Sequence, residues 1–152
     1  MPAIVLAAAS AVWLLLLAAA TSGAGDAFVW DGVYRFASYI CHQQPDRSFH
    51  WDGAPWPVCA RCLGLYAAAP LGALAAQADR PRPLSRGGNV FLLCLAGMFT
   101  ALTWLGEHLL GWPVSNAHRF AAALPLGAAV AWVIARTLAE NSQYTLPDAR
   151  WG

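Results

Sequence analysis

Apolar residues are gathered in four long runs, which short polar or charged segments separate. The runs cover residues 2–21, 57–78, 89–110 and 116–139. A helix needs about 20 mainly apolar residues to cross roughly 30 Å of hydrocarbon, and each run meets or approaches that length. The pattern therefore predicts an all-α integral membrane protein, a single domain built as a bundle of four transmembrane helices.

The first run also suits the apolar core of a cleaved signal peptide, because it ends in Ala18, Ala19 and Ala20 before a stretch of small residues. However, no arginine or lysine precedes Ile4, and the run is longer than the apolar core of most signal peptides. We expect this segment to be retained as the first membrane helix.

The segment between the first two runs, residues 22–56, has its own helical pattern. Apolar side chains recur there at helical spacing, at Val29, Val33, Phe36 and Ile40. Asp31 and Arg35 are placed for an i,i+4 ion pair on another face. Tryptophan and tyrosine, which favour the lipid headgroup level, are frequent in this segment. The pattern predicts an amphipathic interfacial helix and loop that form a lid over one end of the bundle.

Arginines are densest in the connection at residues 79–88, which carries three of them. Loops on the cytoplasmic side of a membrane are enriched in arginine and lysine. We therefore predict a multi-pass protein of the cell inner (plasma) membrane. In this orientation both termini and the tail at 140–152 are cytoplasmic, while segment 22–56 and the turn at 111–115 face the outer side.

The composition narrows the class of partner. Hydrophobic residues make up 59% of the chain and charged residues 11%, which is typical of membrane proteins rather than soluble domains. The net charge is +1, and the arginines form no basic stripe, so we expect no nucleic-acid partner. The lipid bilayer is the expected partner, and the sequence leaves open a homo-oligomer or a larger membrane complex.

Three of the four cysteines lie within 22 residues, as Cys41-His42 and Cys59-x-x-Cys62. Three thiolates and one imidazole are a common tetrahedral ligand set for zinc, and copper or iron also accept these ligands. We predict a transition-metal site, zinc first, at Cys41, His42, Cys59 and Cys62. His50 competes with His42 for the fourth position.

Two other uses of the cysteines stay open. Cys59 and Cys62, at the expected start of the second helix, could exchange disulfides, with Cys41 as a third thiol. Alternatively, Cys41 could form a structural disulfide with either of them and staple the lid, as in a structural subunit of a membrane complex. Cys94 lies inside the third apolar run and is expected to be a packing residue.

A second group of polar residues is expected at the same membrane face. Glu107 and His108 end the third run, and Asn116, His118 and Arg119 begin the fourth. Glu107 suits either an ion pair with Arg119 or the role of a catalytic base near metal-bound water. The histidines could extend the site or relay protons, and Asn116, or the residue before it, could cap the fourth helix.

Two arginines belong to this polar group as well. Arg61 lies between Cys59 and Cys62 and would favour their thiolate forms. Arg47 follows a turn-like Pro-Asp pair, so it could either hydrogen-bond the loop or receive an anionic headgroup or substrate.

The motifs C-H-Q-Q-P-D-R-S-F at 41–49 and C-A-R-C-L-G-L-Y at 59–66 resemble the signature of a family of small bacterial and archaeal membrane proteins, catalogued as a domain of unknown function. Asn116 and Arg119 match a later Asn-x-x-Arg element of that family. The resemblance implies a polytopic membrane protein with a metal or redox centre and favours His42 over His50. Where the family pattern has an aspartate followed by glycine, this chain carries Glu107-His108.

Overall fold

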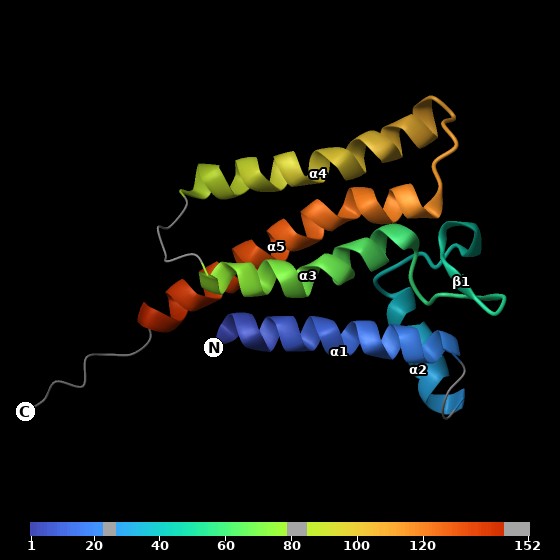
Figure 1. Ribbon diagram of the computed structural model, residues 1–152, viewed down its shortest axis with the longest axis horizontal. Coiled ribbons are helices and arrows are strands. Elements are labelled where there is room, and N and C mark those ends of the chain that lie inside the picture. The colour runs from blue at the N-terminus through green and yellow to red at the C-terminus, as the bar shows by residue number, and fades with distance from the viewer. Residues whose placement is uncertain (23–26, 79–84, 145–152) are drawn as a thin grey trace, which may run out of the picture.

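The computed structural model describes residues 1–22, 27–78 and 85–144, and this part of the chain is mostly helical (Figure 1). Its elements, in chain order, are α1 (Pro2–Ser22), α2 (Ala27–Ser38), the 3-10 helix η1 (Pro45–Arg47), β1 (His50–Trp51), β2 (Ala54–Pro55), α3 (Ala60–Ala78), α4 (Arg86–Leu109) and α5 (Asn116–Tyr144). Most of the predicted connection at 79–88 and of the predicted tail at 140–152 lies outside the described residues.

Within the described residues, three helices are long and apolar enough to cross a membrane, namely α1, α4 and α5. This confirms an all-α membrane protein. The fourth predicted span corresponds to α3, which does not meet the same criterion. It has 19 residues, and Arg61, two glycines and Pro70 dilute its apolar character.

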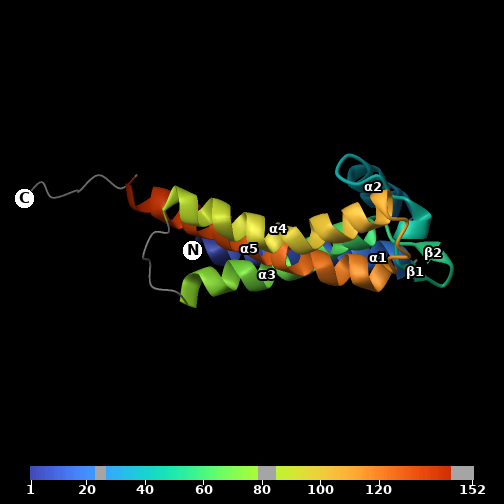
Figure 2. The ribbon, with the colours of Figure 1, turned by 90° about the horizontal axis from the view of Figure 1, so that it is seen from above.

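The four long helices lie side by side with alternating directions (Figures 1 and 2). α3 packs against both α1 and α5, whereas α4 packs mainly against α5. The start of α1 and the end of α5 lie at one end of the bundle, while α2 and the β-strands lie at the other (Figure 1). The cysteines and the residues around them are therefore gathered at the end opposite the start of α1 and the end of α5.

α3 and α5 approach so closely that their backbones touch at glycines. A methyl group added at Gly72 would overlap the backbone of Ala128, and one added at Gly127 would overlap the backbone of Leu65. Small residues allow membrane helices to pack in this way, where van der Waals contact rather than water exclusion favours association. The contact fixes the position of α3 and therefore of the cysteines at its start.

The start of α3 differs from the sequence-based expectation. The predicted second span begins at Pro57, but the helix begins at Ala60. The carbonyl of Cys59 accepts the first helical hydrogen bond, from the N–H of Leu63 at 2.9 Å, so Cys59 is the N-terminal cap. Cys59 therefore precedes the helix, and only Cys62 lies in its first turn.

The N-terminal caps of α4 and α5 are of the ordinary kind. Ser85 caps α4, since its side chain accepts a hydrogen bond from the N–H of Gly88. Ser115 caps α5, since its hydroxyl accepts from the N–H of His118. Asn116, the other expected cap, is the first helical residue and makes different contacts.

α2 forms where an amphipathic helix was predicted, and Asp31 pairs with Arg35 at 2.8 Å as expected. α2 packs against α1. Its buried residues are Val33 and Ala37, whereas Phe36 stays half-exposed and meets Trp13 edge to face. The helix thus turns a narrower apolar face to the bundle than its pattern suggested.

A two-stranded hairpin follows, which the sequence interpretation did not include. His50 pairs with Pro55, and Trp51 pairs with Ala54. The connecting residues Asp52 and Gly53 both have positive φ, which is the geometry of a type I′ turn. Aspartate followed by glycine between two short extended segments is a strong signal for this turn, and it was present in the sequence.

The glycine contact between α3 and α5 can be tested by adding one methyl group. We expect Gly72→Ala to destabilise the protein by about 1–3 kcal/mol, the usual cost of overpacking, because the methyl group meets backbone that cannot rotate away. Gly97→Ala on α4 is the matched control, since its nearest neighbour is a flexible Leu126 side chain at 3.7 Å. Thermal unfolding in detergent would compare them, and equal melting temperatures would contradict the close contact.

Candidate functional site

Three thiols meet at the end of the bundle opposite the start of α1 and the end of α5. Cys41 comes from the segment that follows α2, while Cys59 and Cys62 come from the start of α3. The three sulfur atoms all lie within 4.8 Å of one another. All three cysteines are free thiols, Cys41 is buried, and the other two are partly exposed. Cys94 lies apart from them, exposed on α4.

The side chain of Gln43 holds the two cysteine segments together. Gln43 adopts a positive φ of 48°, a conformation that glycine takes more readily. Its amide nitrogen donates to the carbonyl oxygens of Tyr34 at 2.7 Å and Pro57 at 2.8 Å. Tyr34 in turn donates its hydroxyl to the carbonyl of Pro55. These bonds join α2, the Cys41 segment and the approach to α3.

The sulfur of Cys41 lies in a polar environment that favours its thiolate form. The backbone N–H of Cys59 donates to this sulfur at 3.2 Å. The pKa of the Cys41 thiol is well below its usual value, mainly because the thiols of Cys59 and Cys62 donate hydrogen bonds to the sulfur. The start of α3 adds the positive end of a helix dipole. An ionised sulfur is what metal binding and thiol exchange both require.

Neither candidate for the fourth ligand joins the three sulfurs. His42 and His50 are both exposed. His42 lines the same cavity as the cysteines, but among the described residues its ring nitrogens are not part of the group within 4.8 Å. Consecutive residues project in different directions, so the buried Cys41 side chain does not bring the ring of its neighbour to the same point. His42 as a metal ligand stays a prediction.

Beside the thiols, the carboxylate of Glu107 lies within ion-pair distance of three arginines. Arg61 Nη2 donates to Glu107 Oε2 at 2.8 Å, while Arg119 binds Oε1 through both Nε and Nη2. Arg47 Nε lies 3.9 Å from the same Oε1. The exposed side-chain fraction is 10% for Glu107, 15% for Arg61, 12% for Arg119 and 32% for Arg47. Because both carboxylate oxygens accept from arginine, the geometry favours an ion-pair role for Glu107 over that of a base.

Asn116 has a role that the sequence interpretation did not give it. Its side-chain nitrogen donates to the carbonyl of Ser48 at 2.9 Å, and its side-chain oxygen accepts from Arg119 at 2.6 Å. Ser48 is fully buried, and Phe49 packs edge to face on Phe120 of α5. Asn116 therefore fastens the loop to α5 and orients Arg119 toward Glu107.

His108 and His118 stay outside the cysteine site and have local partners. His108 stacks on Trp104 at a ring separation of 4.4 Å and shares a hydrogen bond with the Trp104 carbonyl. His118 shares a hydrogen bond of 2.7 Å with the hydroxyl of Ser115. Both histidines are exposed. The two histidines that could have relayed protons therefore lie at the surface of the described part of the chain, apart from the cysteines.

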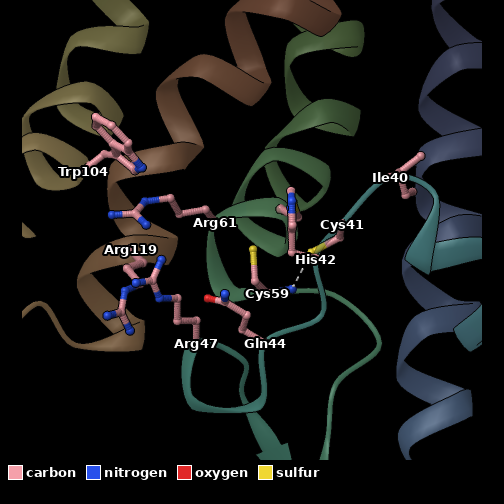
Figure 3. Close-up of a pocket in the computed structure, with 10 residues that line it drawn as sticks. Ile40, Cys41, His42, Gln44, Arg47, Cys59, Arg61, Trp104 and Arg119 are labelled. Atoms are coloured by element: carbon pink, nitrogen blue, oxygen red, sulfur yellow. Dashed lines mark hydrogen bonds between the residues drawn. The ribbon is translucent and has the colours of Figure 1, made fainter. Parts of the chain in front are cut away.

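A cavity of about 330 Å³ joins the two clusters (Figure 3). Its lining combines thiols, guanidinium groups and two apolar side chains, from Ile40, Cys41, His42, Gln44, Arg47, Cys59, Arg61, Cys62, Trp104 and Arg119. Figure 3 shows the arginines on one side and the Cys41 and Cys59 sulfurs on the other. A molecule in this cavity would meet sulfur nucleophiles or a thiolate-bound metal on one wall and three positive charges on the opposite wall.

Comparison with known proteins supports a membrane protein. Residues 41–133 match the model of a family described as "Predicted membrane protein (DUF2085)". An uncharacterized protein of Methanothermobacter thermautotrophicus is 54% identical over 28 residues, which cover 18% of this chain and 25% of that protein. An uncharacterized protein of Methanocaldococcus jannaschii is 53% identical over 34 residues, 22% of each chain. The chain thus covers about a quarter of these curated relatives. No solved structure matches.

The ion-pair cluster gives a sharp stability test. We expect Glu107→Gln to destabilise the protein by about 3–5 kcal/mol, because it leaves the largely shielded Arg61 and Arg119, whose side chains are only 15% and 12% exposed, without their counter-charge. Asp31→Asn is the matched control, since it breaks the exposed pair with Arg35 and should cost at most about 1 kcal/mol. Denaturant unfolding in detergent would compare them. Similar losses in both variants would contradict a buried, stabilising cluster.

Proposed function

Because the chain belongs to the DUF2085 family of predicted membrane proteins, we propose that it is a polytopic membrane protein that binds or handles a transition metal through Cys41, Cys59 and Cys62. The observation that carries the proposal is the close approach of three sulfurs from two separate segments. A tetrahedral zinc with bonds of about 2.3 Å to sulfur holds its ligand sulfurs about 3.8 Å apart. Sulfurs within 4.8 Å of one another need only small movements to reach that spacing.

The fourth metal ligand is His42 in this proposal. His42 is adjacent to Cys41 and already lines the cavity, so a side-chain rotation rather than a change of fold would bring it inward. His50 lies in the hairpin, outside the cavity lining. Zinc suits the three thiolates and one imidazole best, and copper or iron also suit them.

The metal site faces the outer side of the membrane in this proposal, with α3 as a fourth span. At 1.5 Å per residue, the 19 residues of α3 extend roughly 28 Å, close to the thickness of the hydrocarbon core. α3 also packs between α1 and α5 along the bundle. Four spans place both termini on one side of the membrane, and the arginine-rich connection at 79–88 makes that side the cytoplasm. α2 with the hairpin then forms the interfacial cover at the outer end.

A thiol-disulfide oxidoreductase is the second candidate, because Cys59 lies at a helix start beside the Cys41 sulfur and lines an open cavity. A thiolate of the Cys59–Cys62 pair would attack a substrate disulfide and release one substrate thiol. The other cysteine would then displace the second substrate thiol, leaving a disulfide in the protein and a reduced substrate. No metal is needed for this exchange.

Metal content and free thiols, measured on the same detergent-purified sample, distinguish the two functions. We expect about one zinc per chain, as a single tetrahedral site requires, with all four cysteines reduced. Cys59→Ser should lose the metal, whereas Cys94→Ser, the matched control on α4, should keep it. Absence of metal together with two missing thiols would contradict the metal site and favour the oxidoreductase.

The same preparations test the fourth ligand. Cobalt in place of zinc gives absorption bands whose intensity depends on the ligand set. We expect His42→Ala to change these bands and His50→Ala to leave them unaltered. The opposite result would assign His50 as the ligand.

The number of spans is tested by reporter fusions at each terminus. We expect a fluorescent protein, which folds in the cytoplasm, to be active at both ends, and alkaline phosphatase, which needs the outer compartment, to be inactive at both. An even number of spans puts both termini on one side. Termini on opposite sides would show that α3 does not cross the membrane.

A further inference from the structure

The cavity beside the thiols has more positive charge than its protein partners neutralise. Three guanidinium groups, those of Arg47, Arg61 and Arg119, line it, and a single carboxylate, Glu107, pairs with them. Asp46 is exposed and is not part of the lining. Burying cations costs free energy unless anionic partners compensate them, so this surplus needs an explanation.

The three arginines are not equally engaged. Arg119 binds Glu107 through two nitrogens and Asn116 through a third. Arg61 gives one nitrogen to Glu107, and its buried Nε has no hydrogen-bond partner among the described residues. Arg47 reaches Glu107 only at 3.9 Å and is the most exposed of the three. Arg47 and Arg61 therefore retain donors for a further anion.

The chain segments that carry the arginines bear on how many acceptor oxygens the anion has. They come from three segments, the loop after α2, the first turn of α3 and the first turn of α5, and Figure 3 shows their guanidinium groups gathered on one wall of the cavity. A planar carboxylate has two acceptor oxygens. A terminal phosphate has three, arranged tetrahedrally, and arginine forks bind such oxygens in pairs.

We propose that this cavity is a binding site for a terminal phosphate group, held chiefly by Arg47 and Arg61 beside the three thiols. Glu107 and Asn116 position the arginines and do not touch the ligand. The phosphate has two possible sources, free inorganic phosphate or the headgroup of a phosphomonoester lipid. Ile40 and Trp104, which line the same cavity, would contact the apolar part of a lipid. The arginines that would bind the phosphate are not among the proposed metal ligands.

Calorimetric titration of the full-length protein in detergent tests the proposal, before and after metal is removed with a chelator. The probes are inorganic phosphate, dihexanoyl phosphatidic acid, which has a terminal phosphate, and dihexanoyl phosphatidylcholine, which has none. We expect saturable binding of at least one of the first two and none of the third. Binding that survives metal removal would keep this proposal separate from the metal site.

The arginine variants sharpen the test. Arg47→Gln should weaken phosphate binding about tenfold or more, the loss expected for one charge-assisted hydrogen bond. Arg35→Gln is the matched control, because Arg35 is exposed on α2 and outside the cavity lining. Arg47→Lys keeps the charge but lacks the planar guanidinium, so it should weaken phosphate binding by a smaller factor. This second variant keeps the test valid if Arg47→Gln does not fold.

The outcomes are distinct. Phosphatidic acid that binds much more tightly than phosphate would identify the lipid as the source, and equal affinities would identify the phosphate group alone. Absence of binding by both probes, or equal affinities in Arg47→Gln and Arg35→Gln, would overturn the proposal.

Discussion

The ion pairs of the partly buried Glu107 carboxylate are the interactions on which the rest of the site depends. The carboxylate is carried by α4, and it pairs with arginines from the loop after α2, from α3 and from α5. α4 otherwise packs mainly on α5, where Thr100 donates a hydrogen bond to the carbonyl of Ala122. A single negative charge therefore joins four segments at one end of the bundle. Hydrophobic contact alone would hold these segments less specifically in a membrane, since lipid competes for apolar surfaces.

This arrangement explains why thiols and guanidinium groups share one cavity. Arg61 lies between Cys59 and Cys62 at the start of α3, so the turn that presents the thiols also presents a cation. Close backbone packing at Gly72 and Gly127 fixes α3 against α5, and Gln43 fixes the Cys41 segment against the approach to α3. The geometry of the sulfurs thus depends on contacts outside the cysteines themselves.

The helices and the grouping of the cysteines could be predicted from the sequence, because both follow from local features. Apolar runs of membrane length identify α1, α4 and α5, and the spacing of Cys59 and Cys62 identifies two thiols at a helix start. The hairpin could also have been predicted, since Asp52-Gly53 is a sequence signal for a type I′ turn. The first residue of α3 could not be predicted in this way, because a proline can precede a helix without being part of it.

Contacts between distant segments could not be predicted in the same way. Arg119 was expected to pair with Glu107, but the convergence of Arg47 and Arg61 on the same carboxylate depends on how three chain segments fold back on one another. Asn116 looked like a cap, yet it binds Ser48 almost 70 residues away, because Ser115 already satisfies the helix start. A polar side chain at a helix end has several possible partners, and packing decides among them.

The position of Arg61 also couples the two halves of the cavity. Its guanidinium binds Glu107 while its backbone belongs to the turn between Cys59 and Cys62. An anion that draws this guanidinium toward itself would reduce the positive potential at the sulfurs, whereas a metal held by three thiolates would add negative charge there. By thermodynamic linkage, each ligand must then alter the affinity of the other by the same factor. Three of the few charged residues of this membrane protein thus lie beside its only cluster of three thiols within the described residues.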